Sequence, residues 1–190
     1  MSFLLLLLLL FMVGGAIAYC LTIYNGLVAV KNNVDKAWAN IDVLLKQRHD
    51  ELPSLIEVCK GYMKYEADTL QRVTQARNQF AAAVTVDQKT EASANLSSAL
   101  GRLIATAENY PDLKANANFT QLQVRITELE SEIADRREFY NDSVNTFNIR
   151  IQEMPDAVLA ASMNLHPRQM FQVAAEDKEP VKISFADVSH

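Results

Sequence analysis

The chain has 190 residues, of which 49% are hydrophobic, and it carries a formal net charge of −5. This length supports one core-bearing domain with an appendage, and a second full domain is not expected. Nucleic-acid binding needs Lys and Arg clustered in excess, so the acidic balance excludes a basic nucleic-acid-binding surface. Five Gly and five Pro are few for this length, and the composition predicts an all-α protein.

The N-terminal segment, Phe3 to Tyr24, contains no charged residue. As a helix it would extend about 33 Å, enough to cross a hydrocarbon core of about 30 Å. A cleaved signal peptide is the alternative, since Ala16 to Ala18 form an A-x-A site. However, no Lys or Arg precedes the apolar run, and the run continues beyond that site. We expect a retained membrane anchor, and a lipoprotein is less favoured because Tyr19 precedes Cys20 where a small residue is expected.

The positive charges nearest to the apolar segment all follow it, namely Lys31, Lys36, Lys46 and Arg48. The positive-inside rule therefore predicts that the C-terminal body lies in the cytoplasm. The chain is then expected to cross the membrane once.

Apolar residues then recur every three or four positions from Val34 to Phe80, which predicts a long amphipathic helix. Pro53 interrupts it, because an interior proline loses a hydrogen bond and pushes against the preceding turn. The apolar stripe keeps its phase across Pro53, so one kinked helix is favoured. A helix-turn-helix at Asp50 to Pro53 is the alternative.

Two further helices are predicted. Thr85 or Asp87 caps a helix over about 88–109. Pro111 then disfavours helix at Tyr110, and the surrounding Asn and Asp are typical of a turn. The third helix covers about 118–154, where Pro155 ends it.

The region from Pro155 to His190 carries weaker signals. A short amphipathic helix is expected first, then a turn or extended piece at 166–171, then an alternating strand-like stretch at 180–185. We therefore predict a transmembrane anchor (1–24), an antiparallel up-and-down bundle of three to four long helices (25–154) and a short, loosely structured tail (155–190).

The pattern Tyr-Asn-x-x-Val-x-x-x-Asn occurs twice. The Asn and Val of each copy share a helix face, because 3.6 residues make one turn. An interfacial anchor explains Tyr24 but not the second Tyr. We hypothesise that the two stripes meet across helices, within one chain or between chains, as matched seams. Their residues are Tyr24, Asn25 and Asn32, and Tyr140, Asn141 and Asn148.

Four charged residues are also singled out: Arg48, Glu66, Glu130 and Arg137. Arg48, Glu66 and Arg137 fall on apolar stripes. A buried unpaired charge costs several kcal/mol, so these positions need partners or water. One interpretation is a network of ion pairs that fixes the register of the helices, and this is favoured. The other is a polar pocket or partner-binding groove.

Catalytic and metal-binding patterns are not found in the sequence. A di-iron helical bundle uses Glu-x-x-His pairs, and none of His49, His166 and His190 has Glu three positions earlier. Glycine-rich nucleotide loops and nucleophile motifs are missing as well. Cys20 and Cys59 are expected to be buried apolar residues rather than disulfide partners. We expect no enzyme activity, cofactor or metal.

Several stretches together resemble the LemA family of bacterial membrane-anchored helical proteins. They are the run Leu45-x-x-Arg48-x-Asp50-x-x-Pro53-x-Leu55, the turn Tyr110-Pro111-x-Leu113-Lys114, and the series Glu130, Arg137, Tyr140 and Asn141. The resemblance covers nearly all of the chain after the apolar segment. Two departures are small: Glu51-Leu52 replaces an aliphatic pair, and Ser54 replaces an Asn.

The resemblance implies a helical bundle on one transmembrane helix, without a recognised catalytic activity. One branch of the family is implicated in forming magnetosome membranes. The expected function is a non-enzymatic scaffold or interaction module that self-associates at the bacterial inner membrane. Its expected partners are the lipid bilayer, copies of itself and another membrane protein. Two alternatives stay open: an envelope-facing monomeric adaptor for one partner protein, and a ligand-responsive sensor with a polar cavity.

Overall fold

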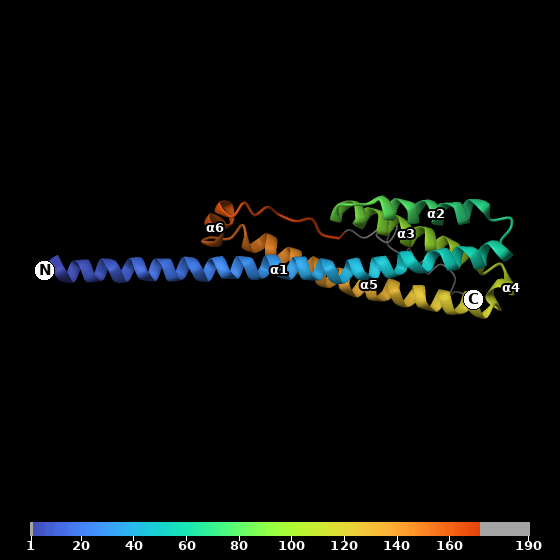
Figure 1. Cartoon of the computed structure of the whole chain (residues 1–190), viewed down its shortest axis with the longest axis horizontal. Helices are drawn as coiled ribbons and strands as arrows, with labels where there is room; N and C mark the ends of the chain where they lie inside the picture. The colour runs from blue at the N-terminus through green and yellow to red at the C-terminus, as the bar shows by residue number, and fades with distance from the viewer. Residues whose placement is uncertain (1, 172–190) are drawn as a thin grey trace, which may run out of the picture. The chain divides into compact units, whose positions relative to one another are not determined.

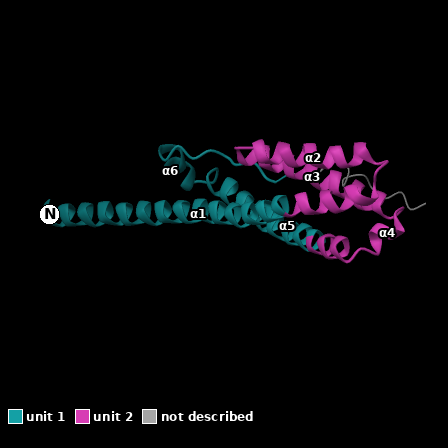
Figure 2. Cartoon of the chain, turned by 45° about the vertical axis from the view of Figure 1, so that its right-hand side comes forward, with its two compact units in different colours: residues 1–50, 126–171 teal, residues 51–125, 172–190 magenta. Residues whose placement is uncertain are grey.

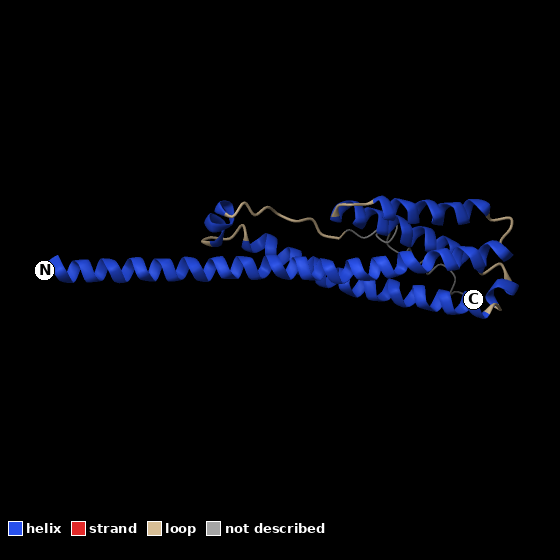
Figure 3. Cartoon of the chain, viewed as in Figure 1, coloured by secondary structure: helices blue, strands red, loops and turns tan. Residues whose placement is uncertain are grey.

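A computed structural model of the protein describes residues 2–171, and within them the chain forms helices without a strand (Figure 3). In chain order the helices are α1 (Ser2–Tyr62), α2 (Ala67–Ala82), α3 (Val86–Ala107), α4 (Pro111–Lys114), α5 (Ala117–Arg150) and α6 (Asp156–Ser162) (Figure 1). The all-α prediction is confirmed. The predicted strand-like stretch at 180–185 lies outside the described residues.

The chain divides into two compact units, shown in different colours in Figure 2. Unit 1 comprises residues 1–50 and 126–171, and unit 2 comprises residues 51–125 and 172–190. The dividing points lie inside α1 and α5. The predicted boundaries at residues 24 and 154 remain predictions.

Helix α1 corrects two sequence-based expectations. It runs through Pro53, so the helix-turn-helix alternative at 50–53 is wrong. The same helix ends at Tyr62, and four residues separate it from α2, whereas the sequence predicted one helix as far as Phe80. Periodicity did not reveal this break because buried apolar residues continue across it: Cys59 before the link, Met63 within it and Leu70 after it. The link also contains no Pro, Asn or Gly, the usual signs of a turn.

In unit 1, α1 and α5 form an antiparallel pair. Trp38 packs against Tyr140, with ring centroids 5.7 Å apart, while Arg48 pairs with Glu130. Arg48 follows Trp38 in α1, whereas its partner Glu130 precedes Tyr140 in α5 by the same number of residues, so the two helices run in opposite directions. The buried α5 positions of this unit are Ile126, Leu129, Ile133, Tyr140, Val144 and Phe147. Their steps of three, four and seven are those of a coiled-coil seam.

In unit 2, α2 and α3 form a helical hairpin. Thr85 caps α3 through a capping box with Gln88: the backbone N–H of Gln88 donates to Thr85 Oγ1 at 3.2 Å, and Gln88 Oε1 accepts from the backbone N–H of Thr85 at 3.1 Å. Pro111 occupies the first turn of α4, where its missing N–H is harmless. Asn116 Oδ1 then accepts from the backbone N–H groups of Asn118 and Phe119 in the first turn of α5.

The segment after α5 contains the expected short helix, α6. Residues 165–171 follow it without helix or strand. Within this part Ala160 and Phe171 are buried, and the loosely structured tail over 155–190 remains a prediction. Arg150 links its beginning to the helix pair: its guanidinium lies where a Cβ on Gly26 would be and donates to Asp156 at 2.7 Å.

Burial of Cys59 leads to a reactivity prediction. Burial raises the pKa of this thiol from 9.0 to about 11, so the thiolate fraction at pH 8 falls about 100-fold. In a Cys20→Ser variant, iodoacetamide should therefore modify Cys59 slowly in the native protein, faster as the pH rises toward 11, and rapidly in denaturant. Peptide mass spectrometry measures the modification. Equal rates in native and denatured protein would contradict this assignment.

Candidate functional site

The apolar N-terminal part of α1 is unburied along its whole length. Residues 2–22 are exposed, and Ile23 is the first buried side chain. Among the described residues, α1 is the helix long and apolar enough to cross a membrane. An apolar surface of this extent is not stable in water and is typical of a lipid-facing segment. The protein is therefore membrane-associated through one candidate N-terminal helix.

The first Tyr-Asn copy lies just after this segment. The side chains of Tyr24, Asn25 and Asn32 are exposed. Within the chain they do not form the matched seam that we hypothesised, because the Asn residues of the second copy bond elsewhere in unit 1. Tyr24 is placed where an interfacial aromatic residue belongs, at the end of the apolar segment.

Arg48 and Glu130 meet inside unit 1. Arg48 is fully buried, and its Nη1 donates to Glu130 Oε1; the Glu130 side chain keeps 31% of its exposure. The pair joins α1 to α5, the geometry expected of an ion pair that sets helix register. In the same stretch of α1, Asp50 lies beside His49 at 3.2 Å and Pro53 is exposed.

Glu66 belongs to unit 2 and is bonded there by Tyr110, whose hydroxyl donates to Glu66 Oε1 at 3.1 Å. Burial, followed by this hydrogen bond and the Glu66 charge, raises the pKa of Tyr110. The contact joins the link after α1 to the residue that precedes α4. A second hydrogen bond joins the end of α1 to the residue before α5: the Asn116 side-chain amide donates to the Tyr62 hydroxyl at 3.0 Å.

The second Tyr-Asn copy binds the segment that follows α6. Asn148 donates to the carbonyl of Arg168 and accepts from its N–H, both at 2.8 Å. Asn141 does the same with Phe171, at 3.1 and 2.7 Å. The Tyr140 hydroxyl donates to the carbonyl of Gln169 at 3.2 Å. These side chains therefore recognise the backbone of an extended segment.

Phe171 ends that segment in an aromatic cluster. Its exposed fraction is 2%, and its ring centroid lies 6.5 Å from that of Trp38. The guanidinium carbon of Arg137 lies 5.5 Å from the same centroid, a cation–π geometry. Arg137 thus faces an aromatic ring here, whereas Glu66 is bonded in the other unit.

Three residues of this region were not among the sequence-based candidates: Asp35, Arg168 and Phe171. Arg168 donates to Asp35 and its guanidinium carbon lies 5.6 Å from the Phe147 centroid. One feature of the sequence could have pointed to Arg168 and Phe171. They lie three positions apart in a stretch that has no helical periodicity. Such a stretch needs tertiary partners to be ordered.

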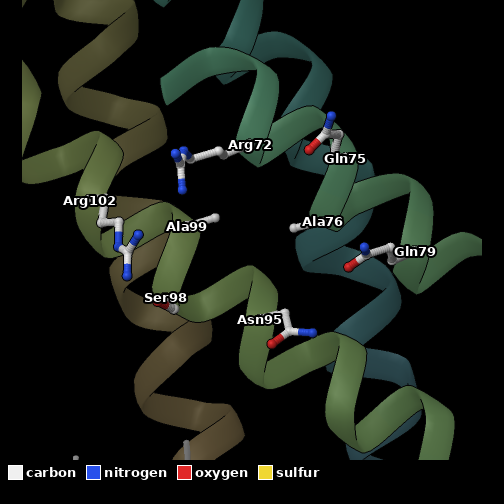
Figure 4. Close-up of a pocket in the computed structure, with 8 residues that line it drawn as sticks. All are labelled: Arg72, Gln75, Ala76, Gln79, Asn95, Ser98, Ala99 and Arg102. Atoms are coloured by element: carbon white, nitrogen blue, oxygen red, sulfur yellow. The ribbon is translucent and has the colours of Figure 1, made fainter. Parts of the chain in front are cut away.

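Unit 2 has a polar hollow of about 280 Å³ between α2 and α3 (Figure 4). Its polar lining residues are Arg72, Gln75, Gln79, Asn95, Ser98 and Arg102. Arg72 already donates to Asp68 at 2.8 Å, and its side chain is 55% exposed. A ligand-responsive sensor would need a polar cavity, and this polar hollow is open to solvent. Water screening weakens charge recognition at such an exposed position.

Within residues 2–171, no three or more His, Cys, Asp or Glu side chains are grouped so as to hold a metal ion. The arrangements found in unit 1 are a buried ion pair, an aromatic cluster and amide groups bonded to backbone.

The chain is similar in sequence to several known proteins. The chain is 28% identical over 162 residues to the protein LemA of Metamycoplasma hominis, which covers 84% of this chain and 74% of that protein. It is 32% identical over 90 residues to the magnetosome protein MamQ 2 of Paramagnetospirillum magneticum, covering 47% and 33% of the two chains. With the magnetosome protein MamQ of Magnetospirillum gryphiswaldense the identity is 21% over 163 residues, or 72% and 60%.

The chain thus spans about a third and three fifths of the two magnetosome proteins. The model of the LemA family matches residues 37–185, which contain the Arg48–Glu130 pair and both Asn side chains that bind backbone. This match covers most of the chain and all of the helices after α1. The protein therefore belongs to the LemA family.

Proposed function

We propose that this protein is a non-enzymatic scaffold of the bacterial inner membrane, whose helical body lies in the cytoplasm and self-associates. The observation that carries the proposal is the continuity of α1. The exposed apolar segment and the buried positions from Ile23 to Leu45 belong to one helix and one compact unit. No flexible linker separates anchor from body.

This continuity has a consequence for assembly. A body attached through an unbroken helix is presented at a constant orientation to the bilayer. Neighbouring copies then offer the same surfaces to one another at high local concentration, which favours association even through weak contacts. Exposed apolar side chains on unit 1, among them Val43 and Phe139, supply contact area for it. The name of the MamQ relatives, magnetosome proteins, agrees with a role at a membrane.

The charge placement supports the cytoplasmic orientation. Lys31, the basic residue nearest to the apolar segment, follows that segment. A reporter fused to the C-terminus tests this side of the membrane directly: an enzyme that is active only in the periplasm should stay inactive.

The mass of the detergent-solubilised protein tests self-association. We expect full-length protein to form a uniform assembly in mass photometry, and a chain starting at Tyr24 to give a smaller species, because removing the anchor removes the common orientation. Monomers in both preparations would contradict the scaffold and favour the adaptor that binds one different protein.

A further inference from the structure

The segment 165–171, hereafter the strap, is held on α5 mainly through its backbone. Five hydrogen bonds from Tyr140, Asn141 and Asn148 reach its carbonyl and N–H groups. Each Asn uses both ends of its amide on a single residue of the strap. This arrangement requires an extended chain, because a helix would already use the same backbone groups internally.

The spacing of the two Asn residues fits an extended chain. Asn141 and Asn148 are seven residues apart on a helix, which is about 10.5 Å. Their partners, Phe171 and Arg168, are three residues apart, which is about 10 Å in extended backbone. The strap therefore runs antiparallel to α5, and the two Asn amides are spaced to match backbone positions three residues apart in an extended segment.

Side chains add sequence preference to this backbone reading. Arg168 lies over the Phe147 ring and donates to Asp35. Phe171 inserts beside Trp38 and under the guanidinium of Arg137. An acidic and aromatic site for the first position and an enclosed aromatic site for the fourth define the pattern Arg-x-x-Phe. We call this surface of α1 and α5 the strap groove, lined by Asp35, Trp38, Arg137, Tyr140, Asn141 and Asn148.

We propose that the strap groove is a peptide-recognition site, and that in assemblies of this protein it is occupied by the strap of a neighbouring copy. This inference rests on the proposed self-association, and it names the two surfaces through which copies would contact each other: the strap and the strap groove. A second copy carries the same Arg-x-x-Phe segment, so every hydrogen bond and ring contact of the strap is reproduced between copies. Exchange of an identical element is a low-cost route to an assembly.

The exchange requires the turn after α6 to open, because the N–H of Leu165 donates to the carbonyl of Ala160 and that of Asn164 donates to the carbonyl of Ala161. Once these hydrogen bonds open, residues 163–167, which join α6 to Arg168, reach at most about 17 Å. A neighbouring copy is a possible partner when its strap groove lies within this distance of α6, and the common membrane raises the effective concentration of each strap at the other groove.

The first experiment tests the groove without relying on self-association. The probe is a fluorescent, C-terminally amidated peptide of residues 164–171, added to full-length protein in nanodiscs that hold one copy. The receptor is the strap-defective variant Arg168→Ala/Phe171→Ala, whose helical content is checked by circular dichroism. If that variant unfolds, Arg168→Ala alone replaces it.

We expect this receptor to bind the peptide at least tenfold more tightly than the same variant with Asn141→Ala/Asn148→Ala added. Asn145→Ala is the matched control, since Asn145 is an exposed residue of the same helix, and it should leave binding unchanged. Wild-type protein should bind more weakly than the receptor, because its own strap competes. A folded receptor that does not bind the peptide would overturn the proposal.

The second experiment tests the occupant. Copies with a defective groove (Asn141→Ala/Asn148→Ala) and copies with a defective strap (Arg168→Ala/Phe171→Ala), carrying different tags, are mixed in detergent. If straps are exchanged, capturing one variant through its tag should also capture the other variant, because one copy supplies the strap and the other supplies the groove. Each variant alone should associate at least tenfold less than the mixture. Copies with Asn145→Ala and Met170→Ala should behave as wild type.

The outcomes separate the two proposals. If wild-type copies associate but the defective copies do not complement each other, self-association stands and exchange of the strap is wrong. If no copies associate while the peptide binds, the scaffold is wrong, the second copy is excluded as occupant, and the groove holds the strap of its own chain.

Discussion

Replacing Arg48 by Ala is expected to lower the free energy of unfolding by about 3 to 5 kcal/mol. Arg48 is fully buried and its guanidinium bonds Glu130 across the helix pair. The substitution leaves the Glu130 carboxylate without this partner and opens a cavity on the α1 side. Since Glu130 keeps 31% of its exposure, water compensates in part, and we expect the lower end of that range. Urea unfolding in detergent, followed by far-UV circular dichroism, measures it.

Arg72→Ala is the matched control. Arg72 also pairs with a carboxylate, that of Asp68, but the two side chains are 55% and 78% exposed. An exposed pair contributes about 0 to 1 kcal/mol, so this variant should unfold almost as wild type. The double variant Arg48→Met/Glu130→Leu should recover much of the lost stability, because apolar side chains of similar size remove both charges. Equal stability losses for Arg48→Ala and Arg72→Ala would show that burial does not determine the effect.

Two arginines in the apolar segment should detach the protein from the membrane. Leu9→Arg and Met12→Arg place charges near the middle of residues 3–24, and each costs about 2.5 to 3.5 kcal/mol at the centre of a membrane helix. We expect the variant to leave the membrane fraction on alkaline extraction, whereas wild type stays with it. The measurement is the share of protein in the membrane pellet.

The control keeps the same positions apolar, as Leu9→Ile and Met12→Leu, and should remain in the pellet. The helical body begins to be buried only at Ile23, so both variants should retain their helical content. Extraction of wild type itself would contradict the membrane anchor, and retention of the arginine variant would show that another surface holds the protein to lipid.

Much of the fold could be predicted because it depends on local patterns. Apolar residues spaced by three and four predicted a long helix where α1 lies, and Thr85 and Pro111 marked helix ends through backbone groups only a few residues away. The break after Tyr62 could not be predicted this way. Its residues continue the apolar period, and the hydrogen bond between Glu66 and Tyr110 joins positions 44 residues apart.

The sequence by itself determined the class of this protein: an apolar helix long enough for a bilayer, followed by amphipathic helices with the LemA pattern. Periodicity and hydropathy act between neighbours along the chain, so they can be read without the fold. Only the tertiary structure decided what the second Tyr-Asn copy does. The amides of Asn141 and Asn148 bond residues that lie 30 and 20 positions away. A polar side chain on a helix face has many possible partners, and the packing of α1, α5 and the strap in unit 1 selects among them.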